Sequence, residues 1–219
     1  MRVMNRTKAL YRSWGIPCKG TQVYTRRHRK QWLNKIRETG VRRRAELFYE
    51  ELDGLQALRR TVRKELLVES RKHPAVKLLR QIPFIGPLRA AQLVAVMQTP
   101  HRFRNKRQLW TYSGLAVVMH DSAQYRYVDG QLLRSKKPQQ VRGLNQNHNR
   151  VIKEIFKSVA LSSTLHPGPF QDFYSGLLAK GMKPEMARLT LARKIAAISL
   201  TLWKKGECFD AKRVKSQAA

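Results

Sequence analysis

The chemistry that this sequence could perform centres on one serine in a strongly basic segment. Residues 121–144, "DSAQYRYVDGQLLRSKKPQQVRGL", contain Ser122 followed by cationic side chains at Arg126, Arg134, Lys136, Lys137 and Arg142. A serine hydroxyl attacks a phosphodiester when a base removes its proton and cations stabilise the charge of the transition state. Most loop serines only form local hydrogen bonds or face water. The residues alone therefore leave both interpretations of Ser122 open.

A second candidate contact lies in the stretch "IPFIGPLRAA", residues 82–91. Apolar residues lead into a Gly-Pro turn, and Pro87 suits the first turn of a helix, where its missing N–H is not needed. Helix, glycine turn and helix together make the helix-hairpin-helix pattern. At Gly86 the backbone can approach a phosphate, the free N–H groups of the helix start can bind it, and Arg89 can add charge. The alternative is a tight turn between two helices with no ligand.

Basic residues also surround a short aromatic helix predicted at residues 106–112. Four of them suit contact with a phosphate backbone: Arg102, Arg104, Lys106 and Arg107. Leu109, Trp110 and Tyr112 give this helix an apolar side, so stacking of the rings on bases is one interpretation. We favour the other interpretation, in which the aromatic rings belong to the core.

The charge balance indicates the class of partner. The 219 residues hold 45 Lys and Arg against 14 Asp and Glu, which gives a net charge of +31 and a pI near 11.2. Like charges repel in a compact protein, so this excess implies a polyanionic partner, and nucleic acid is the first candidate. A membrane surface is less favoured, because the basic residues are spread along the chain and form no short juxtamembrane cluster.

Other classes of function find little support. Cys18 and Cys208 form neither a disulfide framework nor a metal-binding spacing. None of the six histidines is paired at ligand spacing, and the carboxylates form no cluster of the kind that a two-metal nuclease needs. No apolar run reaches the roughly 20 residues of a membrane span, and the N-terminus has no apolar signal region. We expect a cytoplasmic, nucleic-acid-facing protein that binds no metal or cofactor alone and no membrane.

The elements that must position these residues are predicted to be mainly helical. Helices are expected at residues 1–14, 25–38 and 170–180, and another is expected to begin at Asn145. Residues 41–73 contain no proline and predict one long helix. Its apolar residues recur at steps of three or four: Phe48, Leu52, Leu55, Leu58, Val62 and Leu66. This stripe fits a helical hairpin or coiled-coil arm, and it fits a plain packing helix equally well.

The later part of the chain adds one β element and a final helix. Asp129-Gly130, between two short alternating runs, predicts a small β-hairpin or a loop. Pro184 and Gly206 frame a helix that ends near Lys205. The expected fold is mainly α: a long helical or coiled-coil arm, then a helical domain with the helix-hairpin-helix and one small β-hairpin or loop insertion. We expect the domain limits at 1–73 and 74–208, with a flexible tail at 209–219.

The order of these motifs resembles a known family. The run "LLRQIPFIGPLRAAQLVAVMQTPHRFRNKRQLWTYSGLAVV" is similar to the C-terminal domain of the insertion-sequence 110/116/902 transposases, a class that includes the Piv-type DNA invertases. The shared features are the I-P-x-I-G-P hairpin, the F-x-x-x-R-Q-L-W-x-Y-x-G-L helix and the basic loop after it. The runs "RGLNQNHNRVIKEIFKSVA" and "ARLTLARKIAAISLTLWKKGE" resemble later parts of the domain, so the resemblance covers roughly residues 75–208.

The resemblance implies recombination of DNA with a serine nucleophile. In the family this serine lies a few residues after the x-Y-x-G-L helix, and the matching position here is Ser122, which follows Gly114 by eight residues. The family commonly has a Ser-Ser-Gly-Gly context. Here Asp121 precedes the serine and Ala123-Gln124 stand where the glycines are usual, so the local geometry is expected to differ.

The resemblance also implies partners and a metal. The family's metal ligands lie in a separate N-terminal, RNase-H-like acidic domain, which we expect this chain to lack. Mg²⁺ is therefore expected only with a complementing acidic domain. The implied partners are transposon ends, target DNA and a structured guide RNA, and the helical arm suggests a homo-oligomer. Two interpretations remain: a nucleophile-bearing, DNA-binding portion of a transposase, or a non-catalytic remnant or regulator that occupies transposon ends or guide RNA.

Overall fold

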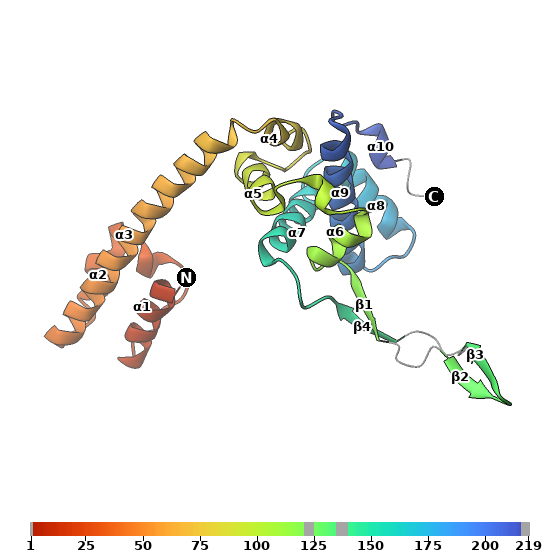
Figure 1. Ribbon diagram of the computed structural model, residues 1–219. Helices are drawn as coiled ribbons and strands as arrows, with labels where there is room; N and C mark the ends of the chain where they lie inside the picture. Colours follow the sequence, from red (N-terminus) through yellow and green to blue (C-terminus); the bar gives the residue numbers. More distant parts are fainter. Residues whose placement is uncertain (1, 121–124, 135–139, 216–219) are drawn as a thin grey trace. The chain divides into compact units, whose positions relative to one another are not determined.

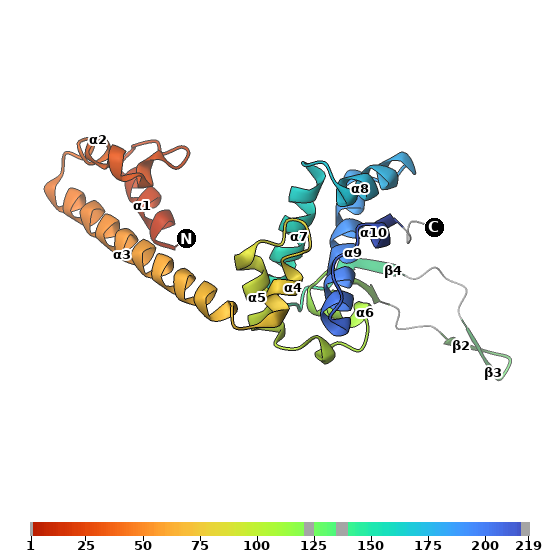
Figure 2. The ribbon, with the colours of Figure 1, turned by 90° about the horizontal axis from the view of Figure 1, so that it is seen from above.

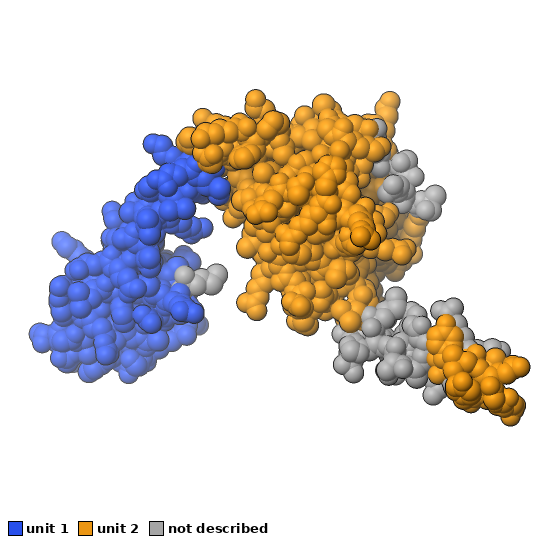
Figure 3. Space-filling model, in the orientation of Figure 1, with its two compact units in different colours: residues 1–66 blue, residues 67–219 orange. Residues whose placement is uncertain are grey.

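The computed structural model describes residues 2–120, 125–134 and 140–215. The chain divides into two compact units, residues 1–66 and 67–219 (Figure 3). Each unit has its own apolar core. The predicted mainly-α class is confirmed, because the strands of the described residues all lie between Val117 and Leu144. Ser122, Lys136 and Lys137 lie outside the described residues.

The first unit consists of helices and short turns (Figure 1). Its core is built around buried aromatic rings. Its elements are α1 (Arg2–Ser13), two 3₁₀ turns (Gln22–Tyr24 and Arg26–His28), α2 (Arg29–Leu33) and the first part of α3 (Thr39–Ser70). The hydroxyls of Tyr11 and Tyr49 lie 3.0 Å apart in a buried hydrogen bond. The Tyr11 ring also meets Trp32 edge to face, so one ring joins all three helices.

The helix predicted over residues 25–38 is wrong, because only Arg29–Leu33 is α-helical there. After Leu33 the chain turns, with the backbone N–H groups of Lys35 and Ile36 donating to the carbonyls of Trp32 and Leu33. This turn lets both Trp32 and Ile36 enter the core. Burial of the two side chains outweighs the weak local preference for a continuous helix.

The predicted long helix is present as α3, which begins slightly before Val41 and ends before Pro74. Its apolar stripe has two parts. Leu52 is buried in the first unit, whereas Leu55, Leu58 and Val62 are about half exposed. Side chains three and four residues apart share one helix face, so these three residues form an exposed apolar seam.

Asp53 of α3 binds two arginines from the second 3₁₀ turn and from α2. Its carboxylate accepts hydrogen bonds from the Arg29 guanidinium at 2.7 and 2.8 Å and from Arg26 Nε at 3.1 Å. These bonds lower the pKa of Asp53 to about 2. The bonds from Arg29 contribute most, and the bond from Arg26 contributes less. Arg29 also lies over the Tyr49 ring, with the guanidinium carbon 4.7 Å from the ring centre.

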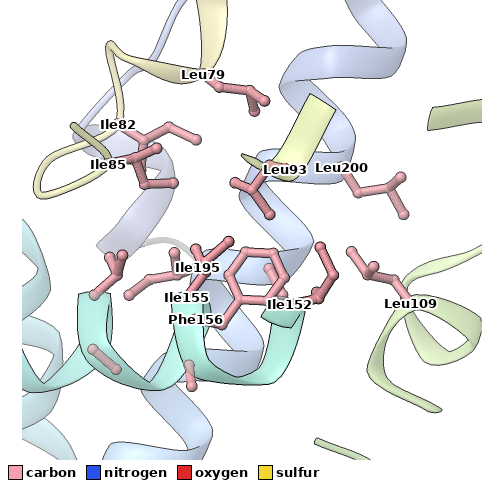
Figure 4. Close-up of a cluster of buried hydrophobic side chains, with 14 of the residues drawn as sticks. Leu79, Ile82, Ile85, Leu93, Leu109, Ile152, Ile155, Phe156, Ile195 and Leu200 are labelled. Atoms are coloured by element: carbon pink, nitrogen blue, oxygen red, sulfur yellow. The ribbon is translucent and has the colours of Figure 1, made fainter. Parts of the chain in front are cut away.

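The second unit is built around α9 (Pro184–Lys205), which packs against α4, α6, α7 and α8 (Figure 1, Figure 2). Its other helices are α4 (Pro74–Leu79), α5 (Pro87–Met97), the 3₁₀ turn η3 (Pro100–Arg102), α6 (Lys106–Tyr112), α7 (Arg150–Thr164), α8 (Pro169–Ala179) and α10 (Lys212–Lys215). Ile195 of α9 lies in the core with Leu93 and Phe156 (Figure 4). The predicted cap is confirmed, because Gly206 ends α9 in the left-handed conformation.

Two antiparallel strand pairs separate α6 from α7 in the sequence. β1 (Val117–His120) pairs with β4 (Gln140–Leu144), a ladder that no local pattern predicts. β2 (Tyr125–Val128) pairs with β3 (Gln131–Arg134). Asp129 and Gly130 both have positive φ, as a two-residue turn between twisted strands requires, so the predicted hairpin is confirmed. Of the predicted cationic contacts, Arg126 lies in β2, Arg134 in β3 and Arg142 in β4.

Two further expectations differ from the structure. The helix expected to begin at Asn145 begins at Arg150, with Asn149 as its N-cap. Asparagine side chains bond to nearby backbone groups, and these bonds favour turns over helix interiors. At the other end, Phe209 and Val214 pack against the core of the second unit, so ordered packing continues past residue 208. The predicted domain limits themselves stay a prediction.

Within the described residues, no helix combines the length and the apolar character that crossing a membrane requires.

Candidate nucleic-acid interface

The turn between α4 and α5 is stabilised by two isoleucines that are buried in the core of the second unit. Ile82 and Ile85 are buried, and the backbone N–H of Ile85 donates to the carbonyl of Ile82 at 3.1 Å. Between them Phe84 has a φ of 65°, an uncommon conformation for a residue with a side chain. The outer part of the turn, Gly86 and Pro87, is exposed.

Arg89 supports this turn. Its guanidinium donates to the carbonyl of Phe84 at 2.8 Å. That bond stabilises the left-handed Phe84 and uses one of the five N–H donors of the side chain. Arg89, predicted as a phosphate contact, therefore has a structural role that the sequence did not indicate. Its part in phosphate binding stays a prediction.

Gly86 is not required by the fold of the chain. Its φ is −71°, which any residue can adopt, and it is the N-cap of α5 without a side-chain hydrogen bond. A Cβ atom added at Gly86 would meet nothing within 4 Å. The space over the start of α5 is thus open. The first-turn N–H groups of a helix have no partner within it, so this space is suited to an anion.

A basic face formed by Arg102, Arg104, Lys106 and Arg107 follows α5, in a long interval of the sequence that contains no acidic residue. No Asp or Glu occurs between Glu69 and Asp121, whereas this interval contains Arg71, Lys72, Lys77, Arg80, Arg89, Arg102, Arg104, Lys106 and Arg107. Of these, Arg102, Arg104, Lys106 and Arg107 lie on η3, on α6 and between them, and all four are exposed. None of the four forms an ion pair within the described residues.

Arg102 and Arg107 line an open depression of about 750 Å³. The other residues of its wall are polar or aromatic: Phe103, Asn105, Gln108, Thr111, Tyr112, Asn147, His148 and Asn149. The Arg102 guanidinium lies over the Tyr112 ring, 4.6 Å from its centre, which fixes the position of that charge. Two cations and several amide donors, without a carboxylate, are suited to a phosphate group.

The far wall of this depression is the loop of residues 145–149, an ordered turn made by three asparagines. Asn145 Nδ2 donates to the carbonyl of Thr111 at 3.0 Å and to that of Asn147 at 2.8 Å. The backbone N–H of Asn149 donates to the carbonyl of Tyr112 at 2.8 Å, and its side chain caps α7 by accepting from the N–H of Ile152. The loop is thereby fastened to the end of α6.

His148 fits against Gly114 without room for a side chain between them. Gly114 has a φ of 65°, and a Cβ atom built there would lie 2.5 Å from the His148 ring. The ring nitrogen Nδ1 is buried and has no hydrogen-bond partner within the described residues. Both the turn and the space it leaves for the ring require glycine at position 114.

α9 holds the opposite side of α6. Trp110 Nε1 donates to the carbonyl of Arg193 at 3.0 Å, and Arg193 Nε donates to the carbonyl of Leu115 at 2.7 Å. Burial lowers the pKa of Arg193. Burial, and then the nearby Lys106 charge, lowers the pKa of Lys194. Leu109 is buried in the core, and Trp110 and Tyr112 are partly buried against it. The aromatic side of α6 therefore packs on the core, as favoured from the sequence, although Tyr112 also lines the depression.

The predicted contacts are only partly brought together. Arg102 and Arg107 share the depression, Gly86 and Arg89 lie at the start of α5, and Arg104 and Lys106 do not line the depression. Sequence reasoning missed Asn145, Asn147, His148 and Asn149. The signal was the "NQNHN" run itself, which is typical of a loop with side-chain-to-backbone bonds. The described residues contain no group of three or more His, Cys, Asp and Glu side chains that could hold a metal ion.

This basic helical unit is similar to proteins of known classification. Residues 76–175 match the model of the Transposase IS116/IS110/IS902 family. A curated relative, an uncharacterized 44.8 kDa protein of insertion element IS116 from Streptomyces clavuligerus, is 25% identical over 131 residues. The match covers 60% of this chain and 30% of the relative, so the chain spans less than a third of that protein.

The matched part of the second unit is thus similar to transposase domains. More specifically, residues 76–175 are similar to the IS116/IS110/IS902 transposase family, which confirms the resemblance found in the sequence.

Replacement of Gly114 by alanine should destabilise the second unit more than the same change at Gly206. Both glycines have a φ near 65°, but a Cβ at Gly206 meets nothing within 4 Å, whereas one at Gly114 meets the His148 ring. Gly206→Ala should lower the free energy of unfolding by about 1 kcal/mol. Gly114→Ala should add a further loss of about 1–3 kcal/mol from overpacking. Chemical denaturation of both variants measures the difference, and equal losses would show that the His148 contact is not tight.

Proposed function

We propose that this chain is the DNA-binding part of a transposase and serves DNA transposition. The observation that carries the proposal is the basic face formed by Arg102, Arg104, Lys106 and Arg107, which are exposed and have no carboxylate partners within the described residues. These residues lie within the segment that matches a transposase family. Unpaired exposed cations on a chain of net charge +31 are costly unless a polyanion neutralises them. Association with the nucleoid is the corresponding expectation in a cell.

The proposed contacts are of two kinds. Arg102 and Arg107, in the depression beside Tyr112, bind a phosphate with their guanidinium groups. At the start of α5, backbone N–H groups bind a second phosphate that approaches over Gly86. Arg104 and Lys106 add charge close by in the sequence, and Arg126, Arg134, Lys136, Lys137 and Arg142 are proposed to extend the interface. Contacts of this kind fix the position on DNA and carry no sequence information by themselves.

The salt dependence of binding tests both contacts. We expect the affinity for a transposon-end duplex to fall steeply with salt. The double variant Arg102→Ala with Arg107→Ala should lower the slope of log K against log salt by about 1, because the one phosphate that the two residues share contributes about 0.9. Gly86→Ala should weaken binding about tenfold, since its methyl group blocks phosphate from the first-turn N–H groups. Fluorescence anisotropy across a salt series measures each effect.

Matched variants separate these effects from unfolding and from loss of charge alone. Arg43→Ala removes a charge that Glu46 and Glu50 already partner, and Gly176→Ala adds a methyl group in open space on α8. Both should bind as the parent does. Alanine is a poorer N-cap than glycine, so the thermal unfolding of Gly86→Ala is measured beside its binding. A folded Gly86→Ala that binds normally would reduce the hairpin to a simple turn.

The chemical part of the proposal assigns Ser122 as the nucleophile, supported by its position in the family motif. Its hydroxyl loses a proton to a base and attacks the phosphorus, an Oγ–P bond forms, and the P–O bond to the leaving DNA hydroxyl breaks as that oxygen takes up a proton. Arginine and lysine charges stabilise the transition state. The described residues offer no set of metal ligands, so Mg²⁺ is proposed only with a complementing acidic domain.

Covalent trapping tests Ser122. Labelled transposon-end DNA is incubated with Mg²⁺, this chain and a full-length family member whose own serine is replaced by alanine. We expect a protein–DNA adduct of this chain's mass, which Ser122→Ala abolishes without changing affinity. DNA binding without any adduct would instead favour the second interpretation, a non-catalytic protein that occupies transposon ends or a guide RNA. Adding transcribed flanking RNA to the same reactions tests the guide RNA as a partner.

We also propose that the chain self-associates through α3, because Leu55, Leu58 and Val62 form an exposed apolar seam at the steps of a coiled coil. Leu55→Asp should lower the mass that light scattering reports, whereas Gln56→Asp, an equal charge change at the next exposed position, should not. A monomeric mass for the parent and both variants would end the idea.

A further inference from the structure

The β2–β3 hairpin exposes much apolar surface for its size. Tyr125, Tyr127, Leu132 and Leu133 are 55%, 74%, 56% and 46% exposed. A two-stranded hairpin is only marginally stable in water, and apolar side chains that face solvent add little to its stability. Four such side chains on two strands of four residues each are therefore available to a partner.

The two tyrosines share one face of the hairpin, because side chains two residues apart in a strand point to the same side. Tyr127 is directly opposite Leu132 in the register, so Leu132 lies beside the Tyr127 ring. Residues two apart in an antiparallel strand are separated by roughly 6.8 Å. Stacked bases are separated by roughly 3.4 Å, so one base fits between two rings at this spacing.

The charge of the surrounding segment favours nucleic acid as the occupant. Residues 121–144 hold five Lys and Arg residues against Asp121 and Asp129. A purely apolar protein partner would have to desolvate these charges, whereas DNA neutralises them with phosphates while its bases meet the rings. The combination of a cationic segment with aromatic rings that every base can stack on is the general way in which proteins hold single strands.

We propose that the β2–β3 hairpin is a base-stacking element, which holds an unpaired DNA base between Tyr125 and Tyr127 with Leu132 beside it. The inference rests on the proposed DNA-binding function and adds to it a preference for unpaired over paired DNA. Strands that are exchanged between duplexes must leave their first partners, so a transposase meets unpaired bases during its reaction. Stacking recognises the face of a base and tolerates any sequence.

Three DNA probes of the same sequence test the inference on the full chain: a paired duplex, a duplex with a central mismatch bubble and a single strand. The bubble and the single strand carry 2-aminopurine, whose fluorescence falls when it stacks. We expect tighter binding to the bubble than to the duplex. Tyr127→Ala should weaken bubble binding about tenfold, remove the fluorescence change and leave duplex binding nearly unchanged.

Three controls keep the result interpretable. Tyr127→Phe keeps a ring and should bind as the parent does. Tyr127→Thr keeps a residue that favours strands but removes the ring, so it should behave as Tyr127→Ala does even if alanine loosens the hairpin. Gln131→Ala, an exposed polar position of the same hairpin, should have no effect.

The outcomes separate this inference from the proposed function. If the parent binds no probe, DNA binding fails and the inference fails with it. If the parent binds DNA but Tyr127→Ala and Tyr127→Thr bind the bubble as well as the parent does, only the base-stacking element is wrong. A lower mass of Tyr127→Ala in light scattering would assign the hairpin to contact between copies of the chain and would also overturn the inference.

Discussion

The geometry of the basic face depends on where α6 ends, and that end is fixed by a pair of reciprocal hydrogen bonds with α9. The Trp110 side chain bonds to the backbone of Arg193, and the Arg193 side chain bonds to the backbone of Leu115. The N–H groups of Leu115 and Ala116 both donate to the carbonyl of Trp110, which closes the helix from within. Each large side chain thus satisfies a backbone carbonyl of the other segment, so the two segments cannot shift independently.

This constraint connects the core to the polar surface. The outer side of α6 presents Arg107 to the depression, while its inner side places Leu109 and Trp110 against the core of the second unit. The asparagine loop then bonds to the carbonyls at the end of the same helix. The cations of the basic face, which repel one another, are therefore held in place on or next to a helix that is bonded on both sides. A bound polyanion would relieve their repulsion without requiring the helix to move.

The sequence predicts well those features that depend on nearby residues. Pro184 and Gly206 mark the limits of α9, and Asp129-Gly130 marks the turn of the β2–β3 hairpin, because each needs only a local backbone preference. The β1–β4 ladder joins strands that lie some twenty residues apart, and no local pattern indicates such a pairing. The second predicted helix failed because burial of Trp32 and Ile36 depends on residues far along the chain.

The candidate site shows the same division. Arg102 and Arg107 are visible in the sequence as charges, but their neighbours in the depression, Asn147 and His148, come from a segment some forty residues away. Arg89 is likewise visible in the sequence only as a cation. In the fold it donates a hydrogen bond to the carbonyl of Phe84, whose backbone has an uncommon positive φ. Whether a charge serves the fold or a ligand depends on three-dimensional contacts that spacing alone does not contain.

The contact between Gly114 and His148 has a consequence for the evolution of the domain. The glycine leaves no space that a methyl group could occupy without moving the ring. A larger residue at position 114 would need a smaller one at position 148, and it would still strain the backbone, because Gly114 has positive φ. The two positions are more than thirty residues apart in the chain. Even so, we expect them to vary together among related domains, or both to be kept.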